Sequence, residues 1–170
     1  AIVFSNCKNC TVDRFTVRDI GSNGVFVDGN NENITISRSH FNRIGASGVC
    51  FVGNPSSVRS PLFEYGQSNS VDQIDLKPGP KTDEYPRKCV VDDCLIEYVG
   101  TTEKQSAGVQ ISMSFGITVK NTTICHTPRS GINVSEGTFG GHRIEGCDVF
   151  DTVRETSDHG SFNSWGRDRY

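Results

Sequence analysis

The feature that most constrains this chain is an internal repeat. When "TVDRFTVRDIGSNGVFVDGN" is set over "TISRSHFNRIGASGVCFVGN", Ile20 falls on Ile44, an offset of 24 residues. The same offset separates Gly21 from Gly45, Gly24 from Gly48, Val25 from Val49 and Gly29 from Gly53. Repeats of this length are typical of stacked architectures, in which each unit buries its apolar residues against its neighbours.

Three further units follow the same pattern, and "AIVFSNC" begins another. They are "CVVDDCLIEYVG" with "SAGVQISMS", then "ITVKNTTICHTPRSGINVSEGT", then "HRIEGCDVFDTVRETSDHGSFNSWG". Each unit holds short β-like runs broken by Gly, Asn and Asp, and none carries the apolar stripe of a helix. Helical repeats are therefore excluded, and a propeller blade would need about 40 residues. The sequence predicts an all-β fold, a right-handed parallel β-helix (a solenoid) of about six coils, with one repeat per coil.

Coils stacked in register, about 4.8 Å apart, would place matched apolar residues in ladders on the inside. The expected ladders are Val12, Ile36, Val91, Val119 and Ile144; Val17, Phe41, Ile96, Ile124 and Val149; and Val25, Val49, Val109 and Ile132. The glycines at 24, 48, 108, 131 and 160 are expected where the chain turns into the last strand of each coil, with positive φ angles.

The seven cysteines do not have the spacing of a disulfide framework. Cys10 and Cys89 share a column with Ile34 and Ile117, which indicates small core residues. Cys94 and Cys147 share a column two coils apart, which is too far for a disulfide. The lone "CKNC" predicts no metal site.

With 170 residues the chain has the size of one domain, and we assign residues 1–170 to one β-helix domain with a long excursion at 54–88. Because it begins within the repeat pattern, we expect a fragment of a longer chain, and a monomer. A net charge of −3 gives no indication of a nucleic-acid partner. No apolar run approaches the roughly 20 residues of a membrane span, so we expect no membrane partner.

The turn before the glycine-led strand changes along the repeats, and insertions at one turn of a solenoid gather on one face. It lengthens from "RDIGSNG" and "NRIGASG" to "EYVGTTEKQSAG" and, in the last unit, "FDTVRETSDHG". Outward positions change in parallel, from Phe26 and Cys50 to Gln110 and Asn133, and then to Ser164 and Trp165. The sequence therefore predicts a polar groove at the later coils. Such a groove suits a carbohydrate, which binds through hydrogen bonds and by stacking on an aromatic ring.

Asp158 is the expected general acid or nucleophile, and His159 its proton partner or orienting group. Glu155 and Glu136 are candidates for a second carboxylate, since acids on neighbouring coils would lie about 5 Å apart, near the separation of retaining glycosidases. Counting back from the glycines places Arg129 beneath Asp158, where it would keep that acid ionised. The expected substrate-binding residues are Arg129, Asn133, Lys104, Gln105, Gln110, Trp165 and Arg167.

The later coils, "EKQSAGVQISMS", "RSGINVSEGTFGGHRIE" and "VFDTVRETSDHGSFNSWGRDRY", resemble bacterial right-handed parallel β-helix proteins of the pectate-lyase-like superfamily. That resemblance implies a secreted, periplasmic or cell-surface protein that acts on a polysaccharide or oligosaccharide, as the glycoside hydrolases of this group do. "DHGSFNS" is also similar to the Gly-His-Gly-Ser run of polygalacturonases. Asp158 replaces the first Gly of that run, which argues against their mechanism.

Three functions remain open from the sequence. The first is a glycoside hydrolase without a cofactor. The second is a polysaccharide lyase or epimerase, in which Lys104 or Arg129 neutralises a uronate and His159 abstracts a proton. Calcium would assist that reaction at Asp148, Asp151 and Glu155. The third is a non-catalytic, glycan-binding surface β-helix, in which "SDHG" is only a turn.

Overall fold

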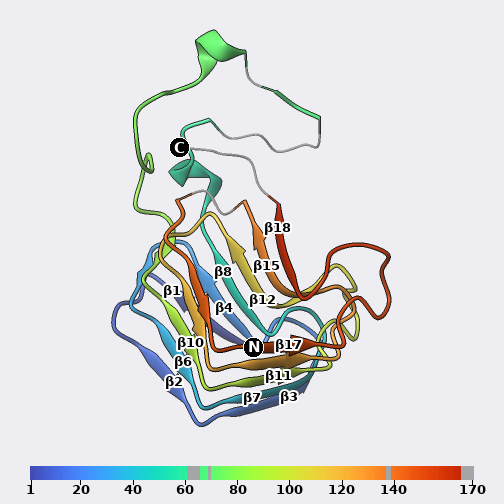
Figure 1. Ribbon diagram of the computed structural model, residues 1–170. Helices are drawn as coiled ribbons and strands as arrows, with labels where there is room; N and C mark the ends of the chain where they lie inside the picture. The colour runs from blue at the N-terminus through green and yellow to red at the C-terminus, as the bar shows by residue number, and fades with distance from the viewer. Residues whose placement is uncertain (61–65, 69, 137–138, 166–170) are drawn as a thin grey trace.

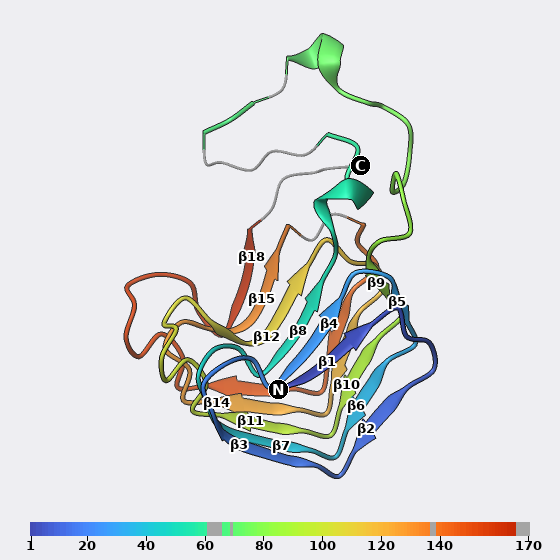
Figure 2. The same ribbon diagram turned by 180° about the vertical axis from the view of Figure 1, so that it is seen from behind.

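The computed structural model describes residues 1–60, 66–68, 70–136 and 139–165. Within these ranges the chain winds into stacked coils, and each full coil passes through three parallel sheets (Figures 1 and 2). Sheet 1 holds β1 (Ile2–Ser5), β4 (Val25–Asp28), β8 (Val49–Val52), β12 (Ala107–Ser112), β15 (Ser130–Ser135) and β18 (Phe162–Trp165), in that order. Sheet 2 holds β2 (Thr11–Asp13), β6 (Thr35–Ser37), β10 (Val90–Asp92), β13 (Thr118–Lys120) and β16 (Arg143–Glu145). Sheet 3 holds β3 (Thr16–Ile20), β7 (His40–Ile44), β11 (Leu95–Glu97), β14 (Thr123–Cys125) and β17 (Asp148–Phe150).

The strands are short because each coil turns three corners, and alternate residues of a strand point inward. On sheet 2, Val91 lies directly between Ile36 and Val119. Phe41 and Ile96 are neighbours in the same way on sheet 3. The remaining registers place every other predicted ladder residue as expected, which confirms the parallel β-helix. Each coil thus buries its apolar residues against the next one.

The corners between the sheets are formed by stacked residues with positive φ. Asn9 (φ 56°), Asn33 (φ 55°) and Lys88 (φ 55°) form one such column, which ends in Gly116 (φ 62°) and Gly141 (φ 71°). The second column is Arg14, Arg38, Asp93, Asn121 and Gly146; the third is Asp19, Arg43, Tyr98, His126 and Asp151. The first two columns therefore turn the chain through the left-handed region, which non-glycine residues seldom adopt, and the third column lies at the ends of the strands of sheet 3.

The glycines that lead the strands of sheet 1 do not have positive φ, so the expectation of left-handed turns there is wrong. They are required by close approach between coils. A Cβ on Gly48 would lie 2.6 Å from Cγ2 of Ile96 and 2.7 Å from the carbonyl oxygen of Gly108. Gly160 does not belong to this column, because the amide of Gly131 donates to its carbonyl and Ile132 pairs with Phe162. Ser161 takes the glycine position in the fifth coil.

All seven cysteines, each within the described ranges, are free thiols. Cys89 is fully buried, and the half-buried Cys10 packs against the same core. Cys94 is also buried. These placements agree with the prediction of small core residues and of no disulfide.

The long excursion leaves sheet 1 after Val52 and returns at β9 (Pro86–Arg87), which pairs with β5 (Asn31–Glu32). Pro86 and Arg87 therefore already belong to the third coil. The excursion carries the 3-10 helices η1 (Pro55–Ser57) and η2 (Val71–Gln73) and projects away from the coils (Figure 1). Arg59 connects the outgoing and returning segments of the excursion, since it donates to the carbonyl of Gly79 and forms an ion pair with Asp75 at 3.2 Å.

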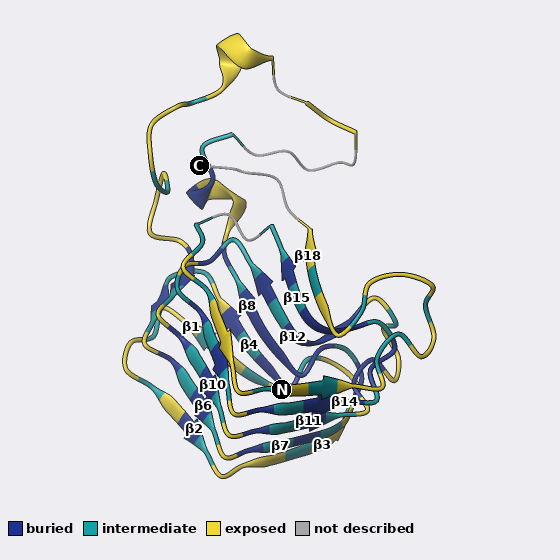
Figure 3. Ribbon diagram, viewed as in Figure 1, coloured by how far each residue is buried: buried dark blue, intermediate teal, exposed yellow. Residues whose placement is uncertain are grey.

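Burial is greatest in the middle coils and falls in the last one, whose strands are mostly exposed (Figure 3). No helix in the described part of the chain is long and apolar enough to cross a membrane.

Candidate functional site

A polar groove forms where turns of unequal length lie side by side on neighbouring coils. The turn at 125–131 is short, and it lies between the longer turns at 97–108 and 150–160. The short turn therefore supplies the floor of the groove and the long turns supply its walls. The backbone amides of Glu155 and Thr156 donate to the carbonyl of Pro128, which fixes one wall to the floor.

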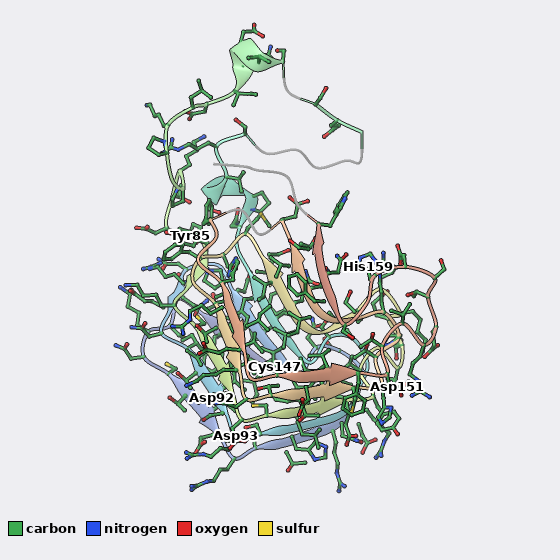
Figure 4. The ribbon with its side chains drawn as sticks, viewed as in Figure 1. Tyr85, Asp92, Asp93, Cys147, Asp151 and His159 are labelled. Carbon is green, nitrogen blue, oxygen red and sulfur yellow. The ribbon has the colours of Figure 1, made fainter. Side chains whose placement is uncertain are left out.

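The groove encloses about 530 Å³. It is lined by Gln105, Ser106, Arg129, Ser130, Asn133, Ser135, Asp158, His159, Asn163 and Trp165. Six of the predicted site residues are thus brought together from three coils. Figure 4 places His159 on the side of the molecule that carries the long turns, far from Tyr85 and Asp92.

Asp158 lies between two nitrogen-bearing side chains. Nη2 of Arg129 donates to Oδ2 of Asp158 at 2.9 Å, and Nδ1 of His159 lies 3.2 Å from Oδ1. The Arg129 and His159 side chains are each 18% exposed, whereas that of Asp158 is 58% exposed. The carboxylate therefore stays open to solvent while its partners are held in the wall and floor.

An amide ladder runs along the outer face of sheet 1, and its members Asn133 and Asn163 line the groove, whereas Gln110 lies just outside it. Nδ2 of Asn133 donates to Oε1 of Gln110 at 2.9 Å, and Nδ2 of Asn163 donates to Oδ1 of Asn133 at 2.7 Å. These residues continue the outward column of Phe26 and Cys50. Polarity thus rises along one column, as the sequence indicated.

Ser164 was expected to face outward on this strand, and this expectation is wrong. It pairs with the inward-facing Val134, and Asn163 takes the outward position. The error has the same origin as the misplaced Gly160, a shift of one residue in the fifth coil. Asn163 could have been found by continuing the inner ladder of Val109 and Ile132 to Phe162, since the next residue then faces outward.

Trp165 pairs with Ser135 in register, lines the groove and is 47% exposed. Its indole ring is therefore a surface group of the groove and not part of the core. An exposed indole face beside hydrogen-bonding side chains is suited to stacking on a sugar ring.

The remaining predicted residues lie outside this groove. Lys104 and Glu155 form a 2.9 Å ion pair that joins the two long turns across the short one, and Glu155 lines an adjoining hollow with Asp158. Glu136 follows β15, whereas Arg129 precedes it. At the rise per residue of a β-strand, the Cα atoms of Arg129 and Glu136 are therefore about 20 Å apart. Glu136 is therefore not brought to Asp158. Arg167 lies outside the described residues.

The acids proposed to hold calcium are not gathered at one point. Asp151 contacts His126 and Arg154, and Glu155 pairs with Lys104. Among the described residues, the one group of three or more potential metal ligands is Glu97, Cys125 and His126. Sequence reasoning missed this group, although its members belong to adjacent repeats. Ser106 and Ser130, on the walls and floor of the groove, were also missed and carry no distinctive sequence signal.

Comparison with known proteins gives one match. No curated protein and no solved structure matched the chain. A family model described as "Right handed beta helix region" matches residues 1–168, nearly the whole length of the chain. That match agrees with the stacked parallel strands and indicates that the coils wind in the right-handed sense. The chain therefore belongs to the right-handed β-helix family.

Proposed function

We propose that this protein binds a polysaccharide in the groove and hydrolyses a glycosidic bond there. The proposal depends on one observation, the convergence of Asp158, Arg129 and His159 beside an amide ladder and an exposed Trp165. Sugars need hydrogen bonds that alternate donors with acceptors, and an aromatic face for the apolar side of the ring. The groove offers both on a rigid sheet, which holds binding groups in place.

Asp158 is the central carboxylate of the proposed reaction. Nη2 of Arg129 holds one oxygen of this carboxylate at 2.9 Å, and the proposed role of Asp158 is that of a nucleophile or a general base. His159 lies at the other oxygen and can carry a proton to or from the site. Glu155, on the same turn, is the proposed second carboxylate, with Lys104 holding its position.

A lyase or epimerase is the second candidate, because Arg129 and His159 line the same groove. Arg129 would neutralise the carboxylate of a uronate, and His159 would remove the proton next to it. Lyase action yields an unsaturated sugar that absorbs ultraviolet light, so its product differs from that of hydrolysis.

The test is a panel of neutral and acidic polysaccharides incubated with the chain, scored for reducing ends and for ultraviolet-absorbing product. We expect Asp158→Asn and His159→Ala to lower the rate by at least about a hundredfold, the usual contribution of a general acid or base. Asp28→Asn, an exposed acid at the end of β4, is the matched control. Wild-type rates in both site variants would contradict the proposal. Glycan binding without any product would assign the groove to recognition alone.

A polysaccharide substrate also suggests where the protein works. We propose that it acts as a monomer outside the cytoplasm, secreted, periplasmic or at the cell surface. Fractionation of the native host, followed by gel filtration of the protein, tests both statements.

A further inference from the structure

A second cluster of chemically active side chains lies on the outer face of sheet 3, apart from the groove. Glu97 on β11 and Cys125 on β14 are direct neighbours in register, and His126 follows Cys125 at the corner. One ligand atom from each of these three residues lies within 4.8 Å of the other two. Carboxylate, thiolate and imidazole on adjacent strands are the ligand types that zinc accepts.

Neighbouring side chains fix the positions of Glu97 and His126 in this cluster. Nε2 of His40 lies 2.9 Å from Oε1 of Glu97, and Nδ2 of Asn42 donates to the same oxygen at 2.8 Å. The His126 ring stacks on Tyr98, with ring centroids 4.4 Å apart. These contacts come from the second, third and fourth coils, so the positions of the potential ligands are set by the stacking of the fold.

Asp151 supplies a second partner for the histidine. Its Oδ2 contacts Nδ1 of His126 from the fifth coil, and Arg154 lies 3.7 Å from the same carboxylate oxygen. Metal-binding histidines usually give a ring N–H to a carboxylate, which fixes the orientation of the ring and raises its basicity. Asp151 therefore stands where the orienting carboxylate of a metal site would be.

The electrostatics of the cluster favour a cation. Cys125 is 4% exposed and lies next to the carboxylate of Glu97 on the neighbouring strand. A bound metal ion deprotonates a coordinating thiol, so the ion would hold a thiolate and a carboxylate together at this place. Zinc ligands lie about 2.0–2.3 Å from the ion, so about 1 Å of side-chain movement would close the cluster around it.

We propose that Glu97, Cys125 and His126 bind one divalent zinc ion, with a water molecule completing a tetrahedral shell. Because Asp151 and Asp158 lie in the same long turn (150–160), such an ion would stabilise the base of the groove wall. This inference does not depend on what the groove binds.

The experiment is a titration of the purified, fully reduced chain with cobalt, a spectroscopic substitute for zinc, followed by displacement with zinc. We expect one cobalt ion per chain, with a sulfur-to-cobalt charge-transfer band in the near ultraviolet that zinc abolishes. Cys125→Ser should remove the band. Glu97→Gln, which keeps the size of a side chain that is 19% exposed, should weaken binding while the far-ultraviolet circular dichroism stays unchanged. Asp151→Asn should weaken zinc binding about tenfold or more, the usual effect of an orienting partner.

Cys147→Ser is the matched control, because Cys147 is half-buried and lies at the other end of β17 from Asp151 (Figure 4). This variant should keep both the band and the one-to-one stoichiometry. The proposal is overturned if no band forms, if the band survives Cys125→Ser, or if Cys147→Ser removes it equally.

Discussion

The first two coils and the last two full coils use the same repeat in different ways. In the early coils, the turns leading into sheet 1 pack backbone against backbone, so that a Cβ on Gly45 would lie 2.3 Å from the carbonyl carbon of Gly21. The turn also covers the outer face, because Sγ of Cys50 contacts the side chain of Asn23. Burial raises the pKa of the Cys50 thiol to about 12. In the late coils the same turn opens into the groove.

Arginine–aspartate pairs join successive coils in both regions, but with different geometry. Arg43 binds Asp19 through two nitrogen atoms at 2.6 and 2.7 Å, which is a bidentate pair. Arg129 meets Asp158 through Nη2, and His159 lies at the other oxygen. A bidentate arginine occupies both carboxylate oxygens. The early carboxylate is therefore bound by one arginine at a corner, whereas the late carboxylate is shared by an arginine and a histidine that both line the groove.

The largest expected effect tests whether burial differs along a single ladder. Ile36 is fully buried in the ladder that ends in Ile144, which is 40% exposed. Ile36→Ala should lower the free energy of unfolding by about 4 kcal/mol, because it leaves a cavity between two coils. Ile144→Ala should cost about 1 kcal/mol, since less area is lost. Urea unfolding measures both, and equal costs would show that the ladder is not packed as described.

The next effect concerns the close packing of the early turns. Gly45→Ala would push a methyl group into the backbone of Gly21, so we expect a loss of about 2 kcal/mol in the free energy of unfolding. Gly21→Ala is the matched control, because a Cβ there meets nothing within 4 Å. The control should change stability by less than about 0.5 kcal/mol. A Gly45→Ala variant as stable as the control would mean that the early turns are not in close contact.

The ladders could be predicted from sequence because identities recur at a fixed offset, and one register determines every inward position of a coil. The fifth coil was misread because Gly160 imitates the strand-leading glycine although Ser161 occupies that place. Arg129 was nevertheless paired correctly with Asp158, since a long arginine side chain tolerates an error of one residue. Nothing in the sequence marks Ser161 as the residue that replaces glycine in this column, so the shift could not be detected.

Other features could not be predicted from the repeat alone. The columns of residues with positive φ contain Arg, Lys and Tyr as well as His, Asn, Asp and Gly, and the first three have no preference for positive φ. The Lys104–Glu155 pair joins turns two coils apart, and its formation depends on how each long turn bends. Such contacts follow from loop shape, which the repeat pattern does not encode.

A smaller effect sharpens the contrast between the arginine pairs. Arg129→Met should lower glycan binding about tenfold, equivalent to about 1.4 kcal/mol, because Asp158 loses its orienting cation. The free energy of unfolding should change by less than about 1 kcal/mol, since Asp158 is mostly exposed. Arg43→Met, which breaks the early pair, should leave glycan binding unchanged. Isothermal titration measures binding, and equal losses in the two variants would remove the functional difference between the pairs.

The smallest effect concerns pH and the ion pair between Asp13 and Arg38 in the early coils. Hydrogen bonds from Arg38 and then from Ser37 lower the pKa of Asp13 to about 2, from an ordinary value of 3.8. Because the folded pKa is the lower one, the stabilisation is complete above about pH 4 and is lost as the pH falls toward 2. The melting temperatures of Asp13→Asn and wild type should therefore differ above pH 4 and converge near pH 2. In an Arg38→Met background the same substitution should have little effect at either pH, since the hydrogen bonds that lower this pKa come mainly from Arg38. A difference that persists at pH 2, or that survives without Arg38, would mean that the Arg38–Asp13 pair does not act through the ionised carboxylate.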